Sequence, residues 1–274
     1  MSKRSPTHFS PVIKWTGSKR SQAPQIVEQF PPEFETYYEP FVGGGAILYQ
    51  SAPPSAVCGD ILNPLIEFWR ILQEDPAHLV DYYERQWQRL QREGHEVYYE
   101  IRDRYNENPN PYDLLFLSRT CVNGLIRFNA KGEFNNSFHH TRPGIHPKRF
   151  KPIAVEWSDR LSHVDFRCGD YRDTSEEATQ RDFVYLDPPY FNTHGRYFGQ
   201  IDYDDFLEYL EKLNSTGVRF ALSYDGRRAE VDYTVEIPSH LYKRRYLLES
   251  GLSPFRKVMD RKAETVKESL YLNW

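Results

Sequence analysis

The sequence has few cysteines and no long hydrophobic run. Its three cysteines, Cys58, Cys121 and Cys168, are odd in number and far apart, so neither a disulfide framework nor a Cys-x-x-Cys metal site is expected. No apolar stretch approaches the ~18 residues that span a bilayer. Residues 1–6 are not followed by the apolar core of a secretory signal. These absences predict a cytoplasmic protein, in a reducing compartment and without a membrane.

What the sequence does contain is typical of a packed domain. Over 274 residues, 39% are apolar, 15% aromatic and 27% charged, which excludes an extended disordered chain. That length allows one large domain, or a core with an insertion.

Charge is spread unevenly along the chain. The net charge is −4, yet seven basic residues and one acid, Glu133, fall between Arg119 and Lys151, which gives this window +6 and leaves −10 for the rest. Polyanions bind through local phosphate contacts, so a local cationic patch matters more than the total charge. The window therefore predicts an anion-binding surface, of the kind that nucleic acid needs.

Strand-like and helix-like segments alternate along most of the chain. We expect strands at 37–42, 56–60, 164–166, 183–186 and 220–224, and a last edge strand at 269–274; helical spacing appears at 46–48, 65–72 and 206–213. This alternation predicts an α/β fold with a doubly wound, mostly parallel sheet.

An inserted segment interrupts this alternation. It is expected to be a charged helical pair over 76–105, then a helix near 113–121, then a hairpin or loop around Ala130-Lys131-Gly132. We expect a catalytic core of residues 1–66 and 156–274, with residues 67–155 as the insertion.

A glycine turn follows the first expected strand. Gly43-Gly44-Gly45 would let a ligand approach the backbone and the amides of the next helix, although a tight turn that binds nothing needs the same residues. Asp60 ends the next strand. A carboxylate there can accept both hydroxyls of a ribose or cap the helix that begins near Asn63-Pro64.

The most specific pattern is Asp187-Pro188-Pro189-Tyr190, directly after the apolar strand 183–186. Open α/β sheets bind ligands at the carboxyl ends of their strands, and two prolines would hold Asp187 and Tyr190 rigidly. A stiff surface turn is the alternative interpretation.

Together with two further motifs, this tetrapeptide resembles the Dam-like DNA adenine-N6 methyltransferases. The motifs are Lys14-Trp15-Thr16-Gly17-Ser18-Lys19 and the Phe41-Val42-Gly43-Gly44-Gly45 loop, and the likeness continues through 123–129 and 131–135. The motif order is that of the family's alpha group. The resemblance implies a class I methyltransferase-like fold and transfer of a methyl group from S-adenosylmethionine to a flipped adenine in a short duplex DNA site. A restriction-modification role and a phage or housekeeping role stay open.

The residue types suit that chemistry. The lone pair of adenine N6 is conjugated into the ring, and two acceptors for its N–H hydrogens, the Asp187 carboxylate and the Pro188 carbonyl, would free it for in-line attack. Tyr190 is the expected stacking face for a base that has left the duplex.

The resemblance also implies a binding site for S-adenosylmethionine. Lys19 would face the methionine carboxylate, Trp15 the sulfonium, and Asp60 the ribose. The full expected set is Trp15, Lys19, Glu39, Phe41, Gly43, Asp60, Asp170, Tyr171 and Asp187. Asp170 and Tyr171, assigned to the cofactor adenine, could equally form a structural turn, and Lys19 alone could be a solvated lysine.

The inserted segment is expected to bind double-stranded DNA. Arg127 suits a bidentate contact to guanine, Asn123 suits a base edge or the backbone, and most of the other cations suit phosphate contacts. The expected set is Arg119, Asn123, Leu125, Arg127, Lys131, Asn135, Arg142, Lys148, Arg149 and Lys151. A restriction–modification role would add a cognate endonuclease, and we expect a monomer or weak dimer.

One stretch departs from the family pattern. Members that methylate GATC commonly carry a proline after Glu-Phe-Asn-x, where Ser137 stands here, and residues 139–145 replace the usual short continuation. The target sequence therefore stays open. Adjacent His139 and His140 would point apart, so no metal site is expected.

Three other functions compete with this interpretation. Methylation of another amine, such as cytosine N4 or an RNA base, is disfavoured by Asp187 preceding Pro-Pro and by the Dam-like insertion. A glutamine methyltransferase would carry Asn-Pro-Pro-Tyr. A catalytically silent DNA-binding module would not need Lys19, Asp60, Asp187 and Tyr190 intact.

Overall fold

One mixed sheet organises the chain. The computed structural model describes residues 9–189, 201–227, 236–250 and 266–274, so Tyr190 lies outside the described residues. The described strands follow the order β3-β2-β1-β4-β5-β7-β6. Their bounds are β1 Tyr37–Glu39, β2 Ala56–Asp60, β3 Val164–Cys168, β4 Phe183–Leu186, β5 Arg219–Arg227, β6 Arg244–Ser250 and β7 Val266–Leu272. The first five in this order pair in parallel, which confirms the expected doubly wound, mostly parallel sheet.

Alternation along each strand supplies both faces of the sheet with apolar side chains. In β4, Phe183 and Tyr185 join one buried cluster, whereas Val184 and Leu186 join the other. The reason is the two-residue repeat of a strand, which sends successive side chains to opposite faces. Because both faces are covered, β4 is apolar along its whole length.

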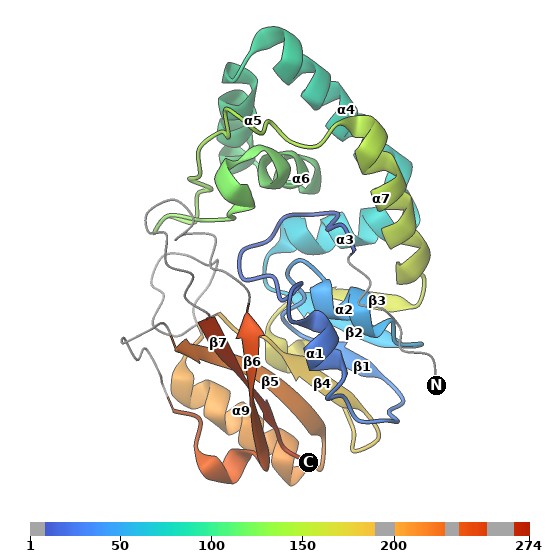
Figure 1. Cartoon of the computed structure of the whole chain (residues 1–274), viewed down its shortest axis with the longest axis vertical. Coiled ribbons are helices and arrows are strands. Elements are labelled where there is room, and N and C mark those ends of the chain that lie inside the picture. Colours follow the sequence, from blue (N-terminus) through green and yellow to red (C-terminus); the bar gives the residue numbers. More distant parts are fainter. Residues whose placement is uncertain (1–8, 190–200, 228–235, 251–265) are drawn as a thin grey trace.

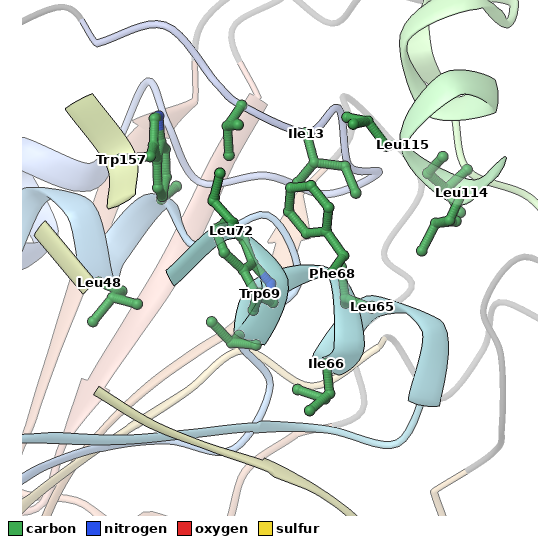
Figure 2. Packing of buried hydrophobic residues seen from close by; sticks show 14 of the residues in the cluster. Ile13, Leu48, Leu65, Ile66, Phe68, Trp69, Leu72, Leu114, Leu115 and Trp157 are labelled. Atoms are coloured by element: carbon green, nitrogen blue, oxygen red, sulfur yellow. The ribbon is translucent and has the colours of Figure 1, made fainter. Parts of the chain in front are cut away.

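Helices cover both faces. The first cluster contains residues of α1 (Ala23–Val27), α2 (Ala46–Ser51), α3 (Asn63–Glu74) and α7 (Pro147–Leu161), and the second contains residues of α8 (Tyr171–Thr174) and α9 (Tyr203–Ser215). Figure 2 shows the dense part of the first cluster, where Trp69 of α3 and Trp157 of α7 lie near each other, with ring centroids 5.4 Å apart. Burial of such large rings is a major stabilising contribution.

The strand order places a topological switch point between β1 and β4. From β1 the chain passes through α2 to β2 on one side, and after β3 it returns through α8 to β4 on the other side of β1. Connections that leave adjacent strands in opposite directions open a crevice at their carboxyl ends, where such sheets bind ligands.

The inserted segment forms a helical layer beyond that crevice. It contains α4 (Pro76–Glu93), α5 (Glu96–Glu107), α6 (Pro111–Thr120) and the short helix η1 (Val122–Gly124), followed by an irregular stretch, and it stands apart from the sheet in Figure 1. The expected helices at 76–105 and near 113–121 are confirmed. Both expected boundaries, 66/67 and 155/156, fall inside continuous helices, α3 and α7.

The last strand differs from its expected place. Residues 266–272 form β7, which lies between β5 and β6 and pairs antiparallel with both, so the prediction of an edge strand there was wrong. The edge is β6, which the sequence analysis did not identify. A further short helix, η2 (Ser239–Leu241), precedes β6. Among the described residues, no helix combines the length and the apolar character needed to cross a bilayer.

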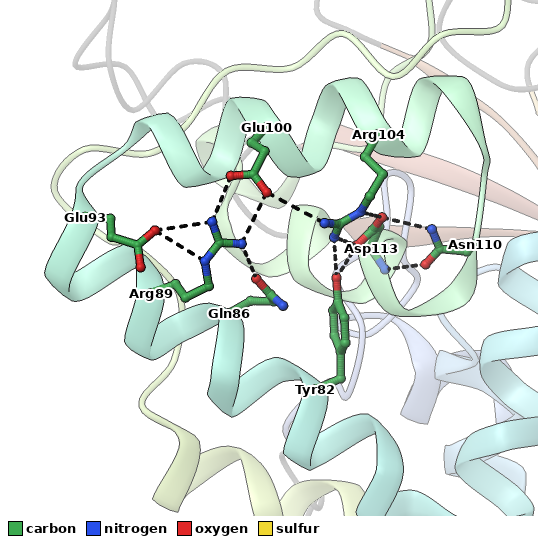
Figure 3. A network of polar contacts seen from close by, with 8 residues as sticks. All are labelled: Tyr82, Gln86, Arg89, Glu93, Glu100, Arg104, Asn110 and Asp113. Carbon is green, nitrogen blue, oxygen red and sulfur yellow. Dashed lines mark hydrogen bonds and ion pairs between the residues drawn. The ribbon is translucent and has the colours of Figure 1, made fainter.

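A polar network stiffens the helical layer (Figure 3). The buried carboxylate of Asp113 accepts hydrogen bonds from Arg104, at 2.5 and 2.9 Å, and from the amide of Asn110 at 2.8 Å. The Tyr82 hydroxyl also donates to it. These contacts join α4, α5 and α6, and a buried carboxylate is tolerated because its oxygens are satisfied.

Replacing Asp113 tests this network. Asp113→Ala should lower the free energy of unfolding by about 2–3 kcal/mol, because donors on α4, on α5 and just before α6 lose their acceptor. Urea denaturation would measure the loss. As a control, Glu93→Ala removes only an exposed partner of Arg89 and Arg92 and should change stability by less than about 0.5 kcal/mol; equal losses in the two variants would contradict the assignment.

Candidate active site

A pocket of about 290 Å³ occupies the switch-point crevice. It is lined by the segment that follows β1, by the ends of β2 and β4, by the start of α8 and by the loop before α1. Every residue expected to bind the cofactor lines the pocket, Asp187 among them, and Pro188 lines it as well. The expected residues found there are Trp15, Lys19, Glu39, Phe41, Gly43, Asp60, Asp170, Tyr171, Asp187 and Pro188.

Asp187 sits at the end of β4 beside a buried cation. The Nζ atom of Lys19 is 2.8 Å from Asp187 Oδ1 and 2.8 Å from Glu268 Oε1. The side chains of Lys19 and Glu268 are 8% and 9% exposed, whereas that of Asp187 is 22% exposed and reaches the pocket. Lys19 therefore contacts two carboxylates of the protein; its expected contact to the carboxylate of a ligand stays a prediction.

The surroundings of Asp187 make it a weaker acid than an exposed aspartate. Burial raises the pKa of Asp187 to about 6; the positive charge of Lys19 lowers this pKa and the negative charge of Glu268 raises it. The carboxylate is thus ionised at neutral pH and becomes protonated as the pH falls through about 6.

The glycine turn is shaped by tryptophan packing. Gly43 has φ +45°, and a Cβ there would lie 2.8 Å from the Trp15 ring; at Gly44 it would lie 2.9 Å from the Trp15 Cβ. The indole N–H of Trp69 donates to Gly43 O at 3.1 Å. Side chains at these positions would displace Trp15, so the glycines let an indole form a wall of the pocket.

Asp60 fixes the same turn. Its carboxylate accepts hydrogen bonds from Gly43 N at 3.3 Å and from Leu62 N at 3.0 Å, just before α3 begins. Burial raises the pKa of Asp60 to about 6 in spite of these hydrogen bonds. Asp60 therefore supports the start of a helix, as the capping interpretation expected. It also lines the pocket, and its contact to ribose hydroxyls stays a prediction.

An aromatic pair and a helix cap form another side of the pocket. The rings of Phe41 and Tyr171 stack with centroids 5.4 Å apart. Asp170 caps α8 by accepting from Arg172 N at 2.9 Å and pairs with the Arg172 guanidinium at 2.8 Å. Asp170 is thus part of a structural turn and of the pocket wall at once.

Glu39 is a buried acid at the base of the pocket. It accepts a hydrogen bond from the Tyr37 hydroxyl at 2.8 Å. Burial raises the pKa of Glu39 to about 8, so it is largely neutral at pH 7.

Residues 126–136 form a hairpin that reaches the same pocket. We call it the recognition hairpin after the role expected of it. Its bridge pairs Phe128 with Phe134, and Asn129 closes the turn by accepting from the backbone N–H groups of Lys131 and Glu133 at 2.9 and 3.0 Å. The expected hairpin is confirmed. Ile126 and Phe128 line the pocket, so the hairpin and the Asp187 turn border one cavity.

Polar side chains fix the hairpin and its neighbouring turn. Arg127 Nε donates to Asn135 Oδ1 at 2.8 Å. The Asn136 amide donates to Leu125 O and Val122 O at 2.8 and 3.0 Å. Arg127 is exposed, so its guanidinium can meet an external partner from a fixed position.

The other residues expected to bind DNA are mostly at the surface. Asn123, Lys131, Arg142, Lys148, Arg149 and Lys151 are exposed, and Leu125 and Asn135 are half-buried. Lys148, Arg149 and Lys151 lie together in the first turns of α7.

Arg119 is an exception, and the prediction of a direct DNA contact at this residue was wrong. It is 8% exposed, and its guanidinium donates to Pro11 O at 2.9 Å and Val12 O at 2.6 Å. The Phe150 ring lies 4.9 Å from the guanidinium carbon. Arg119 thus joins α6 to the N-terminal segment, because an arginine fork satisfies carbonyls that would otherwise be buried without partners.

Several residues of the site escaped the sequence analysis. Glu268, Ile126, Phe128, Asp202 and Asp205 belong to it by contact with Lys19 or by lining the pocket. A single acid beside the apolar run Leu270-Tyr271-Leu272 was a usable signal for Glu268, because a charge in a buried strand needs a partner. No separate signal in the sequence pointed to the two hairpin residues, Ile126 and Phe128.

Comparing Arg119 with Lys148 tests the separation between structural and DNA-facing cations. Arg119→Met should lower the free energy of unfolding by about 1–3 kcal/mol, because two backbone carbonyls lose their donor. Lys148→Ala should leave stability within about 0.5 kcal/mol and should reduce the slope of log K for DNA against log salt by about 1. Thermal or urea unfolding and salt titrations of DNA binding would measure both; an unaltered stability of Arg119→Met would refute its structural role.

Comparisons with known proteins agree with this geometry. The chain is 31% identical to the Type II methyltransferase M.MjaIII of Methanocaldococcus jannaschii over 243 residues, which cover 78% of this chain and 83% of that protein. It is 30% identical to the DNA adenine methylase of Escherichia coli strain K12 over 184 residues, 65% of this chain and 64% of that one. Among solved structures, the rRNA methyltransferase aviRa of Streptomyces viridochromogenes matches 99% of this chain and 88% of its own with TM-score 0.41 and 13% identity, too distant for any inference.

Residues 15–251 match the family described as D12 class N6 adenine-specific DNA methyltransferase. This range includes the Trp15 wall, the glycine turn, the recognition hairpin and Asp187. The chain therefore belongs to the D12 class of N6 adenine-specific DNA methyltransferases.

Proposed function

We propose that this enzyme transfers the methyl group of S-adenosylmethionine to an adenine extruded from a short, specific site in duplex DNA. The observation that carries the proposal is the position of Asp187. It ends β4 at the switch point, in a pocket lined both by the glycine turn and by Ile126 and Phe128 of the recognition hairpin. One cavity would thus receive the methyl donor and the target base.

The pocket fits S-adenosylmethionine by the chemistry of its walls. Asp60 offers carboxylate oxygens suited to ribose hydroxyls, the stacked Phe41 and Tyr171 offer aromatic faces to a purine, and Trp15 offers a face to a sulfonium. When bound, this cofactor supplies an electrophilic methyl group. The volume of about 290 Å³ approaches the range of small-molecule sites.

Asp187 and Pro188 would orient the adenine amine. The Asp187 carboxylate accepts one N6–H and the Pro188 carbonyl accepts the other, which moves the nitrogen lone pair out of conjugation with the ring. Holding the nitrogen in this geometry supplies catalysis through positioning and electrostatics, without a covalent enzyme intermediate. Asp187 must be ionised to accept, and its pKa of about 6 satisfies this at neutral pH.

The segment between α6 and α7 would read the DNA. Arg127, exposed and anchored by Asn135, is proposed to contact guanine, and the exposed cations at the start of α7 are proposed to contact phosphates. The helical layer of α4 to α6, held by the Asp113 network, would support this surface. We propose residues 67–155 as the target-recognition part.

The cellular role is proposed from the relatives. The similar protein of Methanocaldococcus jannaschii is named a Type II methyltransferase, which favours restriction–modification and, with it, a cognate endonuclease that cuts the same site. A monomer that binds one DNA site is the simplest assembly for this chemistry.

Removing the Asp187 carboxylate tests the reaction. Asp187→Ala should reduce the single-turnover rate of methyl transfer from labelled S-adenosylmethionine into duplex DNA by roughly 10³-fold, while DNA affinity changes less than about threefold, because the phosphate contacts remain. In the wild type, this rate should fall about tenfold per pH unit below the Asp187 pKa of about 6. Identification of N6-methyladenine in the product tests the substrate, and near-normal turnover by the variant would refute the role of Asp187.

Arg127 tests the target-reading role. Mapping methylated positions in genomic DNA first identifies the site. Arg127→Ala should then lose about 10- to 100-fold of the discrimination against sites with one changed base. Lys131→Ala, an exposed cation on the hairpin turn, is the matched control and should weaken all sequences alike. An equal loss on every sequence with Arg127→Ala would reduce this residue to a phosphate contact.

A further inference from the structure

Glu268 is a buried acid that the methylation chemistry described so far does not use. It lies on β7, its side chain is 9% exposed, and its Oε1 is 2.8 Å from the Lys19 Nζ atom. A carboxylate removed from water is costly to ionise unless a cation and hydrogen bonds compensate. Its position next to Lys19, which also contacts Asp187, therefore needs an explanation beyond packing.

Lys19 bridges two strands that do not touch. Asp187 follows β4 and Glu268 lies on β7, and β5 separates these strands in the sheet. The backbone of Lys19 is itself fixed, since its carbonyl accepts from Gln22 N at 2.9 Å and Ala23 N at 2.8 Å at the start of α1. The ammonium group thus stands at a set place, with one carboxylate on each side.

A second carboxylate changes what Lys19 does to Asp187. If Lys19 faced Asp187 alone, its charge would hold the aspartate ionised but would also make it a weak hydrogen-bond acceptor. Glu268 competes for the same cation, and its negative charge raises the pKa of Asp187. A more basic carboxylate accepts a stronger hydrogen bond from an amine.

The other titratable groups around Asp187 leave this balance to Lys19 and Glu268. Burial and the negative charge of Asp187 raise the pKa of Glu39 on β1 to about 8, so Glu39 is mostly neutral at pH 7. Tyr185 on β4 is buried, and its pKa lies well above the ordinary value, so it is neutral as well. Among the described groups that act on Asp187, Lys19 and Glu268 carry the charge.

We propose that Glu268 is a positioning residue for methyl transfer: by sharing Lys19 with Asp187, it holds the Asp187 carboxylate in place and keeps it a strong acceptor for the target amine. This rests on the proposed function, because it assumes that Asp187 receives the adenine amine. It assigns to β7 a part in the reaction, although β7 adds no residue to the pocket wall itself.

The variant Glu268→Gln tests this proposal, since it keeps the size of the side chain and removes its charge. The rate of methyl transfer into a saturating DNA duplex would be measured in single turnovers from pH 5 to 9. A single turnover keeps product release out of the measured rate. The acid limb of the profile is the fall of this rate at low pH, and loss of the Glu268 charge should move it to lower pH by roughly 0.5–1 unit. The plateau rate should fall about tenfold, with the apparent affinities for DNA and for S-adenosylmethionine unchanged within about twofold.

Two further variants separate position from charge. Glu268→Asp keeps the charge on a shorter side chain, so its acid limb should stay where the wild type has it while the plateau falls. Glu208→Gln removes an exposed carboxylate of α9 and should reproduce the wild-type profile. Circular dichroism melts check that each variant folds; if Glu268→Gln does not, the Glu268→Asp plateau decides, and an unchanged plateau overturns the proposal.

The remaining outcomes are equally decisive. If the acid limb of Glu268→Gln overlays that of the wild type, whatever the plateau rate, Glu268 only supports the structure and the proposal fails. Failure of the proposed function has a different appearance, because the wild-type protein would then transfer no methyl group to adenine in DNA.

Discussion

A buried lysine between two carboxylates is the interaction on which the active site depends. Lys19 comes from the loop before α1, Asp187 from the end of β4 and Glu268 from β7, and both ion pairs measure 2.8 Å. None of these groups would tolerate burial alone, because desolvating a lone charge costs more than packing returns. The three segments therefore have to be assembled together, and Asp187, the acid proposed to bind the substrate amine, is positioned by the completed sheet.

The glycine turn and the recognition hairpin are tied to this centre by short polar contacts. Asp60 binds Gly43 N, Trp69 binds Gly43 O, and the Thr16 hydroxyl donates to Ile126 O at 2.7 Å. The last contact joins the loop that carries Trp15 and Lys19 to the segment proposed to read DNA. The segment proposed to recognise DNA and the pocket proposed to hold the chemistry are thus in direct contact.

Buried charge serves different purposes in the two parts of the molecule. In the helical layer, Asp113 is satisfied by several donors and acts as a rigid joint between three helices. In the pocket, Glu39, Asp60 and Asp187 have raised pKa values because burial outweighs their hydrogen bonds. Perturbed acids gathered in one cavity are typical of a catalytic site, whereas the Asp113 network is typical of a structural one.

The sequence by itself determined the alternation of strands and helices, the glycine turn, the acid at the end of β4 and the hairpin around Lys131. These features depend on local periodicity and on residue types with strong backbone preferences, which neighbouring positions reveal. Only the tertiary structure decided that Arg119 is buried, that β7 lies inside the sheet and that Glu268 shares Lys19 with Asp187. The burial of Arg119 and the contact of Glu268 with Lys19 join residues more than a hundred positions apart, and the place of β7 depends on its pairing with both β5 and β6. The same arginine or glutamate would suit an exposed surface equally well. The physical reason is that charge and hydrogen-bonding capacity are properties of a residue, whereas the partner that satisfies them is a property of the fold.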